Sequence, residues 1–304
     1  MTPLFDRLVV TTLPFVPRAI VGRVASRYVA GETLEDALGT IRDLAAEGAV
    51  ATLDVLGESV TRAEQTRATT EEYLRALDAL SAAGLLGNVS VKPTAIGLSV
   101  DPALALENGR AICARARERG AFVRIDMEDS SVTEATLRLA LELRSGYDAV
   151  GVVVQAYLRR SLADLDRLVE ARMSVRVCKG IYVEPRSVAY QEREVVRENY
   201  AALVEKLLEG GCPVGVATHD EYCVQRALAT VDRLQVPPER YEFQMLLGVD
   251  PLLRRTLVAA GHRLRVYVPY GRDWYAYSIR RLKENPSISR HVVRATLGLG
   301  PSGA

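Results

Sequence analysis

The most regular feature of the chain is an alternation of short apolar runs with longer stretches of helical periodicity. The runs are rich in β-branched residues, as buried strands are, and each is followed by enough residues for a loop and a helix. Successive runs end 22 to 39 residues apart, which fits a repeated βα unit. We predict eight strands, at residues 50–55, 89–92, 122–126, 150–155, 175–179, 214–218, 241–246 and 264–268.

Eight apolar strands, each with a following helix, favour an α/β fold of the closed (β/α)8 type, a TIM barrel. A doubly wound parallel sheet is the alternative, but it usually has fewer strands and a glycine-rich phosphate loop after the first one. No Gly-x-Gly-x-x-Gly pattern follows residues 50–55. The barrel is therefore the predicted fold, and we assign it residues 49–304.

Residues 1–48 precede the first strand and are predicted to form an N-terminal helical arm. Within it, residues 33–47 have an apolar helical face and end at Gly48. Residues 4–28 carry four arginines against one aspartate, mixed with large apolar side chains. This segment either packs on the barrel or contacts an anionic membrane surface or a partner.

Composition and charge narrow the function classes. Hydrophobic residues make up 48% of the 304 residues and the net charge is +1, which excludes disordered chains and gives no sign of nucleic-acid binding. The four cysteines form no Cys-x-x-Cys pair, so we predict neither a disulfide framework nor a metal site. With no recognisable signal peptide or membrane-spanning run, a reducing, cytoplasmic location is expected. Only four of the 39 basic residues are lysines: Lys92, Lys179, Lys206 and Lys283.

Polar residues stand at the carboxyl ends of the predicted strands, where barrel enzymes place their active sites. Each one alone is explained equally well by a salt bridge at the rim. Together they predict a polar pocket at one end of the barrel. The residues are Asp54 with Glu58, Lys92, Asp126, Gln155, Arg176, Lys179, Thr218, His219, Asp220, Gln244 and Tyr267.

The last predicted helix carries a second signal. Tyr277, Arg280, Arg281 and Glu284 are spaced so that all four share one helical face. Two guanidinium groups on one face present paired donors that match the two oxygens of a carboxylate. The alternative is a solvated face on which Arg280 pairs with Glu284.

In these features the chain resembles the proline dehydrogenase family, whose signature helix carries Tyr-x-x-Arg-Arg-x-x-Glu. Further similar motifs follow in order, about one per strand, over residues 50–285. The resemblance is to the short bacterial members, without a fused aldehyde dehydrogenase domain, and it implies a distorted, flavin-binding barrel. The motifs are VSVKP (89–93), RIDME (124–128), VQAY (154–157), RVCKGIY (176–182), ATHD (217–220), EFQML (242–246) and RVYVPYG (265–271).

The resemblance implies oxidation of L-proline to Δ1-pyrroline-5-carboxylate with FAD as cofactor, the first step of proline catabolism to glutamate. It implies catalytic roles for Lys92, Arg176 and Tyr267, and a lid formed by Glu58 with Arg280. The implied substrate contacts are Lys92, Asp126, Tyr182, Leu246, Tyr267, Tyr277, Arg280 and Arg281. The implied cofactor contacts are Gln155, Arg176, Lys179, Gly180, Thr218, His219, Gln244 and Glu284.

The resemblance also implies partners: a membrane quinone that accepts the electrons, and a separate pyrroline-5-carboxylate dehydrogenase that uses the product. A peripheral contact at the inner face of the membrane would bring the enzyme to the quinone. Two positions depart from the family pattern. Cys178 stands where an aliphatic residue is expected, and Val183 where some relatives carry an aromatic beside the adenosine of FAD, which bears on FAD or FMN preference.

Two other functions compete with this interpretation. Lys92 or Lys179 could be the amine nucleophile of a Schiff-base aldolase, since each ends a predicted strand. That reading leaves the face from Tyr277 to Glu284 without a use. A catalytically silent barrel whose arm binds a partner or a membrane is the second alternative, and failure to bind flavin or a proline analogue would favour it.

Overall fold

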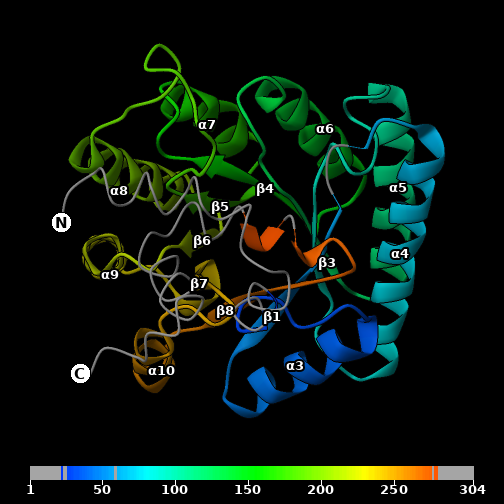
Figure 1. Cartoon of the computed structure of the whole chain (residues 1–304). Coiled ribbons are helices and arrows are strands. Elements are labelled where there is room, and N and C mark those ends of the chain that lie inside the picture. Colours follow the sequence, from blue (N-terminus) through cyan, green and yellow to red (C-terminus); the bar gives the residue numbers. More distant parts are fainter. Residues whose placement is uncertain (1–21, 23–25, 58–59, 276, 280–304) are drawn as a thin grey trace, which may run out of the picture.

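The protein forms a closed barrel of eight parallel strands surrounded by helices, as the computed structural model shows (Figure 1). The structure describes residues 22, 26–57, 60–275 and 277–279. Neighbours in sequence are neighbours in the sheet, and β8 closes on β1. The predicted barrel is thereby confirmed. The strands are β1 (Val50–Val55), β2 (Asn88–Val91), β3 (Phe122–Ile125), β4 (Val150–Gln155), β5 (Ser174–Cys178), β6 (Val214–Ala217), β7 (Tyr241–Leu246) and β8 (Leu264–Tyr270).

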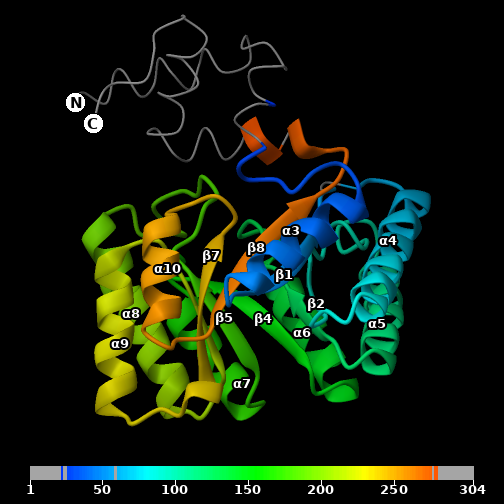
Figure 2. The ribbon, with the colours of Figure 1, turned by 90° about the horizontal axis from the view of Figure 1, so that it is seen from below.

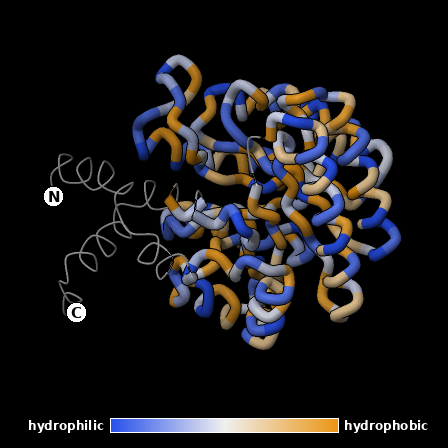
Figure 3. Tube along the Cα trace, turned by 45° about the vertical axis from the view of Figure 1, so that its right-hand side comes forward, coloured by the Kyte–Doolittle hydropathy of each residue, from blue (hydrophilic) through white to orange (hydrophobic). Residues whose placement is uncertain are grey.

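A helix follows each of the first seven strands, and together these helices form the outer layer (Figure 2). Apolar and polar segments alternate along the chain, as expected where one face of a helix rests on the sheet and the other meets water (Figure 3). The helices are α4 (Ala63–Ala82), α5 (Pro102–Glu118), α6 (Thr133–Gly146), α7 (Ser161–Glu170), α8 (Arg193–Glu209), α9 (Glu221–Arg233) and α10 (Pro251–Ala259), with the short 3-10 turn η2 (Pro238–Arg240) before β7.

The helix predicted in the N-terminal arm is present as α3 (Leu34–Ala46). Thr33 caps it, accepting a hydrogen bond from the Asp36 backbone while the Asp36 side chain accepts from that of Thr33. Leu38, Ile41 and Leu44 are buried in the same hydrophobic cluster as the barrel, beside β1 and β8. The domain boundary at residue 48 stays a prediction.

Most of the segment at residues 4–28, which we expect either to pack on the barrel or to contact an anionic membrane surface or a partner, lies outside the described residues. That contact therefore also stays a prediction. Across the part of the chain that the structure describes, every helix is too short or too polar to cross a membrane.

The interior of the barrel is unusually polar. Barrels of this type normally fill their centre with layers of branched apolar side chains. On β2 and β3 the branched residues instead belong to the hydrophobic core between the sheet and the helices, as Val89 and Ile125 do. The buried polar side chains on the strands include Thr52, Asn88, Ser90, Arg124, Arg176, Gln244 and Arg265.

Candidate active site

A cavity of about 740 Å³ opens at the carboxyl ends of the strands. Its wall includes every described residue to which the family resemblance gives a substrate or cofactor contact, whereas Asp54, predicted at the same strand ends, is not on the wall and pairs with Lys92. Glu58, Arg280, Arg281 and Glu284 lie outside the described residues, so the lid and the arginine pair stay predictions. The predicted residues that line the cavity are Lys92, Asp126, Gln155, Arg176, Lys179, Gly180, Tyr182, Thr218, His219, Gln244, Leu246, Tyr267 and Tyr277.

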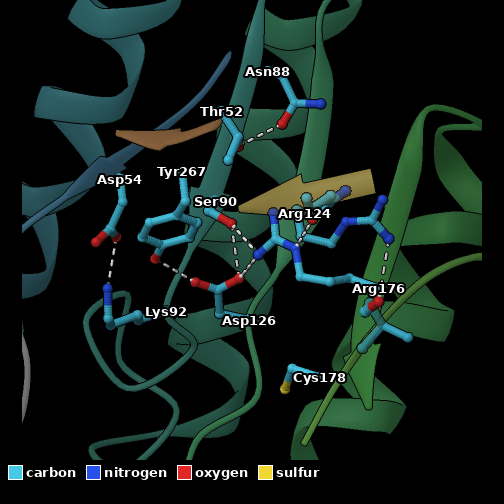
Figure 4. Close-up of polar contacts among 12 residues, drawn as sticks. Thr52, Asp54, Asn88, Ser90, Lys92, Arg124, Asp126, Arg176, Cys178 and Tyr267 are labelled. Atoms are coloured by element: carbon cyan, nitrogen blue, oxygen red, sulfur yellow. Dashed lines mark hydrogen bonds and ion pairs between the residues drawn. The ribbon is translucent and has the colours of Figure 1, made fainter. Parts of the chain in front are cut away.

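Asp126 is the centre of a buried hydrogen-bond network at the bottom of the cavity (Figure 4). One carboxylate oxygen accepts from Ser90 Oγ and from Arg176 Nη1, each at 2.8 Å. The other accepts from the hydroxyl of Tyr267, also at 2.8 Å. The four residues come from β2, β5, β8 and the end of β3, so the closed sheet assembles this network.

Arg176 is held in one orientation by contacts on several sides. Its Nε donates to Gln244 Oε1, and its Nη1 also donates to Ser90 Oγ at 2.9 Å. Its guanidinium carbon lies 5.3 Å from the centre of the Tyr267 ring, within cation–π range. A guanidinium bound in this way is pre-organised, since little side-chain freedom remains to be lost when a ligand arrives.

Glu242 determines which way the Gln244 amide points. Its Oε1 accepts from Gln244 Nε2 at 2.6 Å, and because a carboxylate can only accept, the amide oxygen is left for Arg176. Burial raises the pKa of Glu242, but the charge and hydrogen bonds of Arg265 outweigh it and hold that pKa below its usual value. Gly215 leaves room for the amide, because a Cβ there would lie 2.5 Å from Gln244 Nε2.

Tyr267 is a hydrogen-bond donor in this site and not a base. Burial raises its pKa well above the usual value, and the nearby charges of Asp126 and Asp54 raise it further. The phenol therefore keeps its proton at neutral pH and directs it to Asp126.

The wall of the cavity near Asp126 carries a second buried ion pair. Lys92 Nζ lies 2.6 Å from Asp54 Oδ1, with both side chains more than nine-tenths buried. A Schiff-base nucleophile must be an amine that is free to attack the substrate carbonyl, whereas the Lys92 amine is bound to a carboxylate. Lys179, the other candidate nucleophile, is likewise paired, with Asp220 at 2.9 Å. These pairs argue against the aldolase reading.

The outer part of the cavity is rich in cations arranged around Asp220. Arg197 donates to both of its oxygens at 2.8 Å, and Arg193 lies 3.7 Å away. Burial raises the pKa of Asp220, but hydrogen bonds from Arg197 and Lys179 reverse the effect and hold it well below its usual value. We did not predict the two arginines, although their i, i+4 spacing at the start of the predicted helix after RVCKGIY was available as a signal.

Close packing shapes the loop after β5. Gly180 has a φ of +111°, and a Cβ on it would lie 2.1 Å from the Tyr157 ring. Only glycine fits both the backbone and the space. Cys178, one departure from the family pattern, lines the cavity, and Val183, the other, is fully exposed. The structure leaves the effect of the Val183 departure untested.

His219 and Gln155 act on the backbone around the cavity. His219 Nε2 accepts from the Leu246 amide at 2.9 Å, which ties β6 to the end of β7. Gln155 donates to the Glu128 carbonyl at 2.8 Å, and the Glu128 carboxylate accepts from the backbone and hydroxyl of Thr94. Buried hydrogen bonds of this kind hold the loops after β2, β3 and β4 together.

Comparison with known proteins agrees with the family that the motifs indicate. The family model described as proline dehydrogenase matches residues 37–294. Proline dehydrogenase from Deinococcus radiodurans is 38% identical over 279 residues, and proline dehydrogenase 1 from Bacillus subtilis 36% identical over 273 residues. Each alignment covers 90% of this chain and 90% of the relative.

Longer proteins contain a similar barrel. The bifunctional protein PutA of Escherichia coli is 27% identical over 89% of this chain, which corresponds to 24% of that protein. Proline utilization A from Bdellovibrio bacteriovorus, solved after inactivation by N-propargylglycine, has a TM-score of 0.81 and 25% identity, over 92% of this chain and 36% of that one. The chain thus belongs to the proline dehydrogenase family of oxidoreductases, and to its short bacterial members, which catalyse the first step of proline catabolism.

Proposed function

We propose that this enzyme oxidises L-proline to Δ1-pyrroline-5-carboxylate with FAD as its cofactor, and passes the electrons to a quinone. The observation that carries the proposal is the shared cavity. Residues from most of the strands, predicted separately as substrate or flavin contacts, line one space of about 740 Å³. That volume lies within the range of about 300–1,000 Å³ usual for ligand sites.

We assign the part of the cavity around Asp126 to proline. Lys92 supplies a positive charge for the carboxylate, together with Arg280 and Arg281 of the signature helix. Tyr267, Tyr277 and Leu246 contribute aromatic and apolar surface for the five-membered ring. Fixing the carboxylate and the ring at once orients the C5–H bond, and such positioning can lower a barrier by several kcal/mol.

The donors of the cavity fit FAD. Arg193, Arg197 and Lys179 surround a single aspartate, so positive charge is in excess where an anionic pyrophosphate needs it. Arg176, with Gln155 and Gln244, offers a cation and two amides to a flavin ring. Thr218, His219, Gly180 and Glu284 complete the proposed contacts. Bound FAD would supply the two-electron acceptor for the hydride equivalent that leaves C5.

The residues around Arg176 prepare the site for the charge that accompanies reduction. Asp126, Ser90 and Gln244 fix its guanidinium, so the positive charge is in place before the reaction and needs no reorganisation. Tyr267 keeps its proton on the side of Asp126. Protein groups thus bind and orient the substrate and set the charge around the flavin, whereas the cofactor carries out the redox chemistry.

The remaining parts of the proposal concern the surroundings of the enzyme. Transfer of electrons to a membrane quinone would require contact with the inner face of the membrane. The arginine-rich segment at residues 4–28 is the part of the sequence suited to that contact. The product would pass to a separate pyrroline-5-carboxylate dehydrogenase.

The visible spectrum of the purified protein tests the central claim. We expect flavin absorption that bleaches when L-proline is added without oxygen, and returns when a soluble short-chain quinone follows. D-proline is the matched control and should bleach the protein far more slowly. A colourless protein that borohydride links to a carbonyl substrate would instead establish the aldolase alternative.

A further inference from the structure

A second cavity lies at the opposite mouth of the barrel, at the amino ends of the strands. Its volume is about 350 Å³, and it is lined by the starts of β2, β3, β5, β6 and β7 with the loops before them. We call it the basal pocket. Its charged lining residues are Arg124, Arg240, Arg263, Arg265, Glu239 and Glu242.

Among the residues that the structure describes, Arg124 is a buried cation that forms no ion pair with a carboxylate. It is only 4% exposed, and its guanidinium donates to neutral oxygens alone: the carbonyls of Val152 and Ser174 and the hydroxyl of Ser174. Its Nε is buried with no hydrogen-bond partner in the described part of the chain. Burial lowers its pKa to about 9; the charges of Arg176 and Arg265 act in the same direction, and those of Glu242 and Asp126 offset only part of the effect. An anion close to this group would offset the cost of burying its charge.

The residues packed around the Arg124 guanidinium leave space for it and fix its orientation. A Cβ on Gly151 would lie 2.3 Å from Arg124 Nη1, so the adjacent strand must carry glycine there. The Phe122 ring lies 4.8 Å from the guanidinium carbon, in cation–π contact, and holds it from another side. The orientation of Arg124 is therefore set before any ligand arrives.

The other charges of the basal pocket leave positive charge in excess. Arg263 and Arg265 both pair with Glu242, at 3.2 Å and 2.7 Å. Arg240 pairs with no carboxylate among the described residues, and its buried Nε, like that of Arg124, has no hydrogen-bond partner there. Glu239 is exposed and takes part in no ion pair within the same residues. Two enclosed Nε–H groups next to one small cavity thus lack an acceptor among the described residues, and the net charge of the lining side chains is positive.

We propose that the basal pocket binds a phosphate group, either inorganic phosphate or the phosphate of a small monoester. Guanidinium groups present several donors that match the oxygens of a phosphate. The cavity volume lies near the lower end of the range for small-ligand sites, enough for a phosphate and a modest organic group. The aromatic rings of Phe122 and Tyr241 on its wall can contact such a group.

Isothermal titration of the flavin-loaded enzyme with inorganic phosphate, and separately with AMP, tests the proposal. Arg240→Gln is the informative variant, because this side chain makes a single weak contact, to the Cys212 carbonyl at 3.5 Å, and its loss should leave the fold intact. Arg124→Gln is less suitable, since it would also withdraw donors from the backbone of β4 and β5. Arg42→Gln, at an exposed arginine of α3, is the matched control.

We expect saturable binding of at least one probe, weakened about tenfold or more by Arg240→Gln and unchanged by Arg42→Gln. Binding of phosphate itself would identify the free ion as sufficient, whereas binding of AMP alone would identify a monoester. Failure of both probes to bind would overturn the proposal. So would equal affinities in the two variants, or displacement of the probe by proline, which would place it in the catalytic cavity. Because the titration measures binding and not turnover, its result can support or overturn the basal pocket independently of the proposed proline oxidation.

Discussion

The ion pair between Asp126 and Arg176 is a buried contact whose removal we expect to cost several kcal/mol. Arg176 Nη1 lies 2.8 Å from the Asp126 oxygen, and the two side chains are only 7% and 12% exposed. Two unit charges about 4 Å apart attract by about 4 kcal/mol at an effective dielectric of about 20, against about 1 kcal/mol in bulk water. Loss of one member of a buried pair accordingly costs about 3–5 kcal/mol.

The substitution Asp126→Asn isolates this charge, because it keeps the shape of the side chain and one acceptor oxygen. We expect a loss near the lower limit, about 3 kcal/mol, since the retained oxygen can still accept from one donor. At about 2–4 °C per kcal/mol, the melting temperature should fall by about 6–12 °C. Thermal unfolding followed by circular dichroism, at one fixed FAD concentration, measures it.

A surface pair of the same chemistry provides the control. Asp148 lies 2.7 Å from Arg144, but its side chain is fully exposed. Exposed ion pairs contribute little to stability, so Asp148→Asn should have the same melting temperature as the wild type. Equal melting temperatures for Asp126→Asn and Asp148→Asn would refute the reasoning, because burial would then have no effect on the strength of the pair.

Three further outcomes are expected. Arg281→Met should raise the KM for proline roughly ten- to a hundredfold, because charge-assisted hydrogen bonds to the carboxylate are lost. The KM for prolinamide, which lacks the carboxylate, should not rise in this variant. An unchanged KM for proline contradicts the carboxylate assignment. Gly180→Ala should lower both the flavin content and the melting temperature, because the added methyl group would meet the Tyr157 ring. Gly84→Ala is the control: its φ is also positive, at +66°, but the space around its Cβ is open, so only the melting temperature should fall, and slightly. Equal effects of the two substitutions would mean that the contact with Tyr157 is unimportant. Because the pKa of Asp220 is depressed in the folded state, its contribution to stability is complete above the unfolded pKa, about 3.9, and is lost as the pH falls further. Melting temperatures at pH 5 and pH 3 should therefore differ more in the wild type than in Asp220→Asn, and parallel losses would contradict this role.

The fold and most of the candidate site could be predicted because they depend on local pattern. Eight apolar runs, each with a helix after it, left the closed barrel as the best arrangement, and the carboxyl ends of its strands then had to meet at one mouth. The strand limits shifted by a residue or two. Lys92 and Asp126, for example, lie just beyond β2 and β3 and not inside them.

The pairings between those residues could not be predicted in the same way. Nothing local to Arg176 indicates that Gln244, 68 positions later, accepts its Nε–H, or that Glu242 orients the amide. Arg193 and Arg197 were overlooked because a charged pair at helical spacing is usually a solvated face. Their convergence on Asp220 depends on how α8 and α9 pack side by side.

The sequence by itself determined the order of strands and helices, the family, and which residue types stand at the strand ends. Only the tertiary structure decided that the centre of the barrel is polar, and that Arg124 occupies space left by Gly151 beside the basal pocket. The physical reason is the distance along the chain between the residues that interact. Periodicity and chain motifs record what a residue does with its near neighbours, whereas burial, charge pairing and cavity shape arise only when distant strands close on one another.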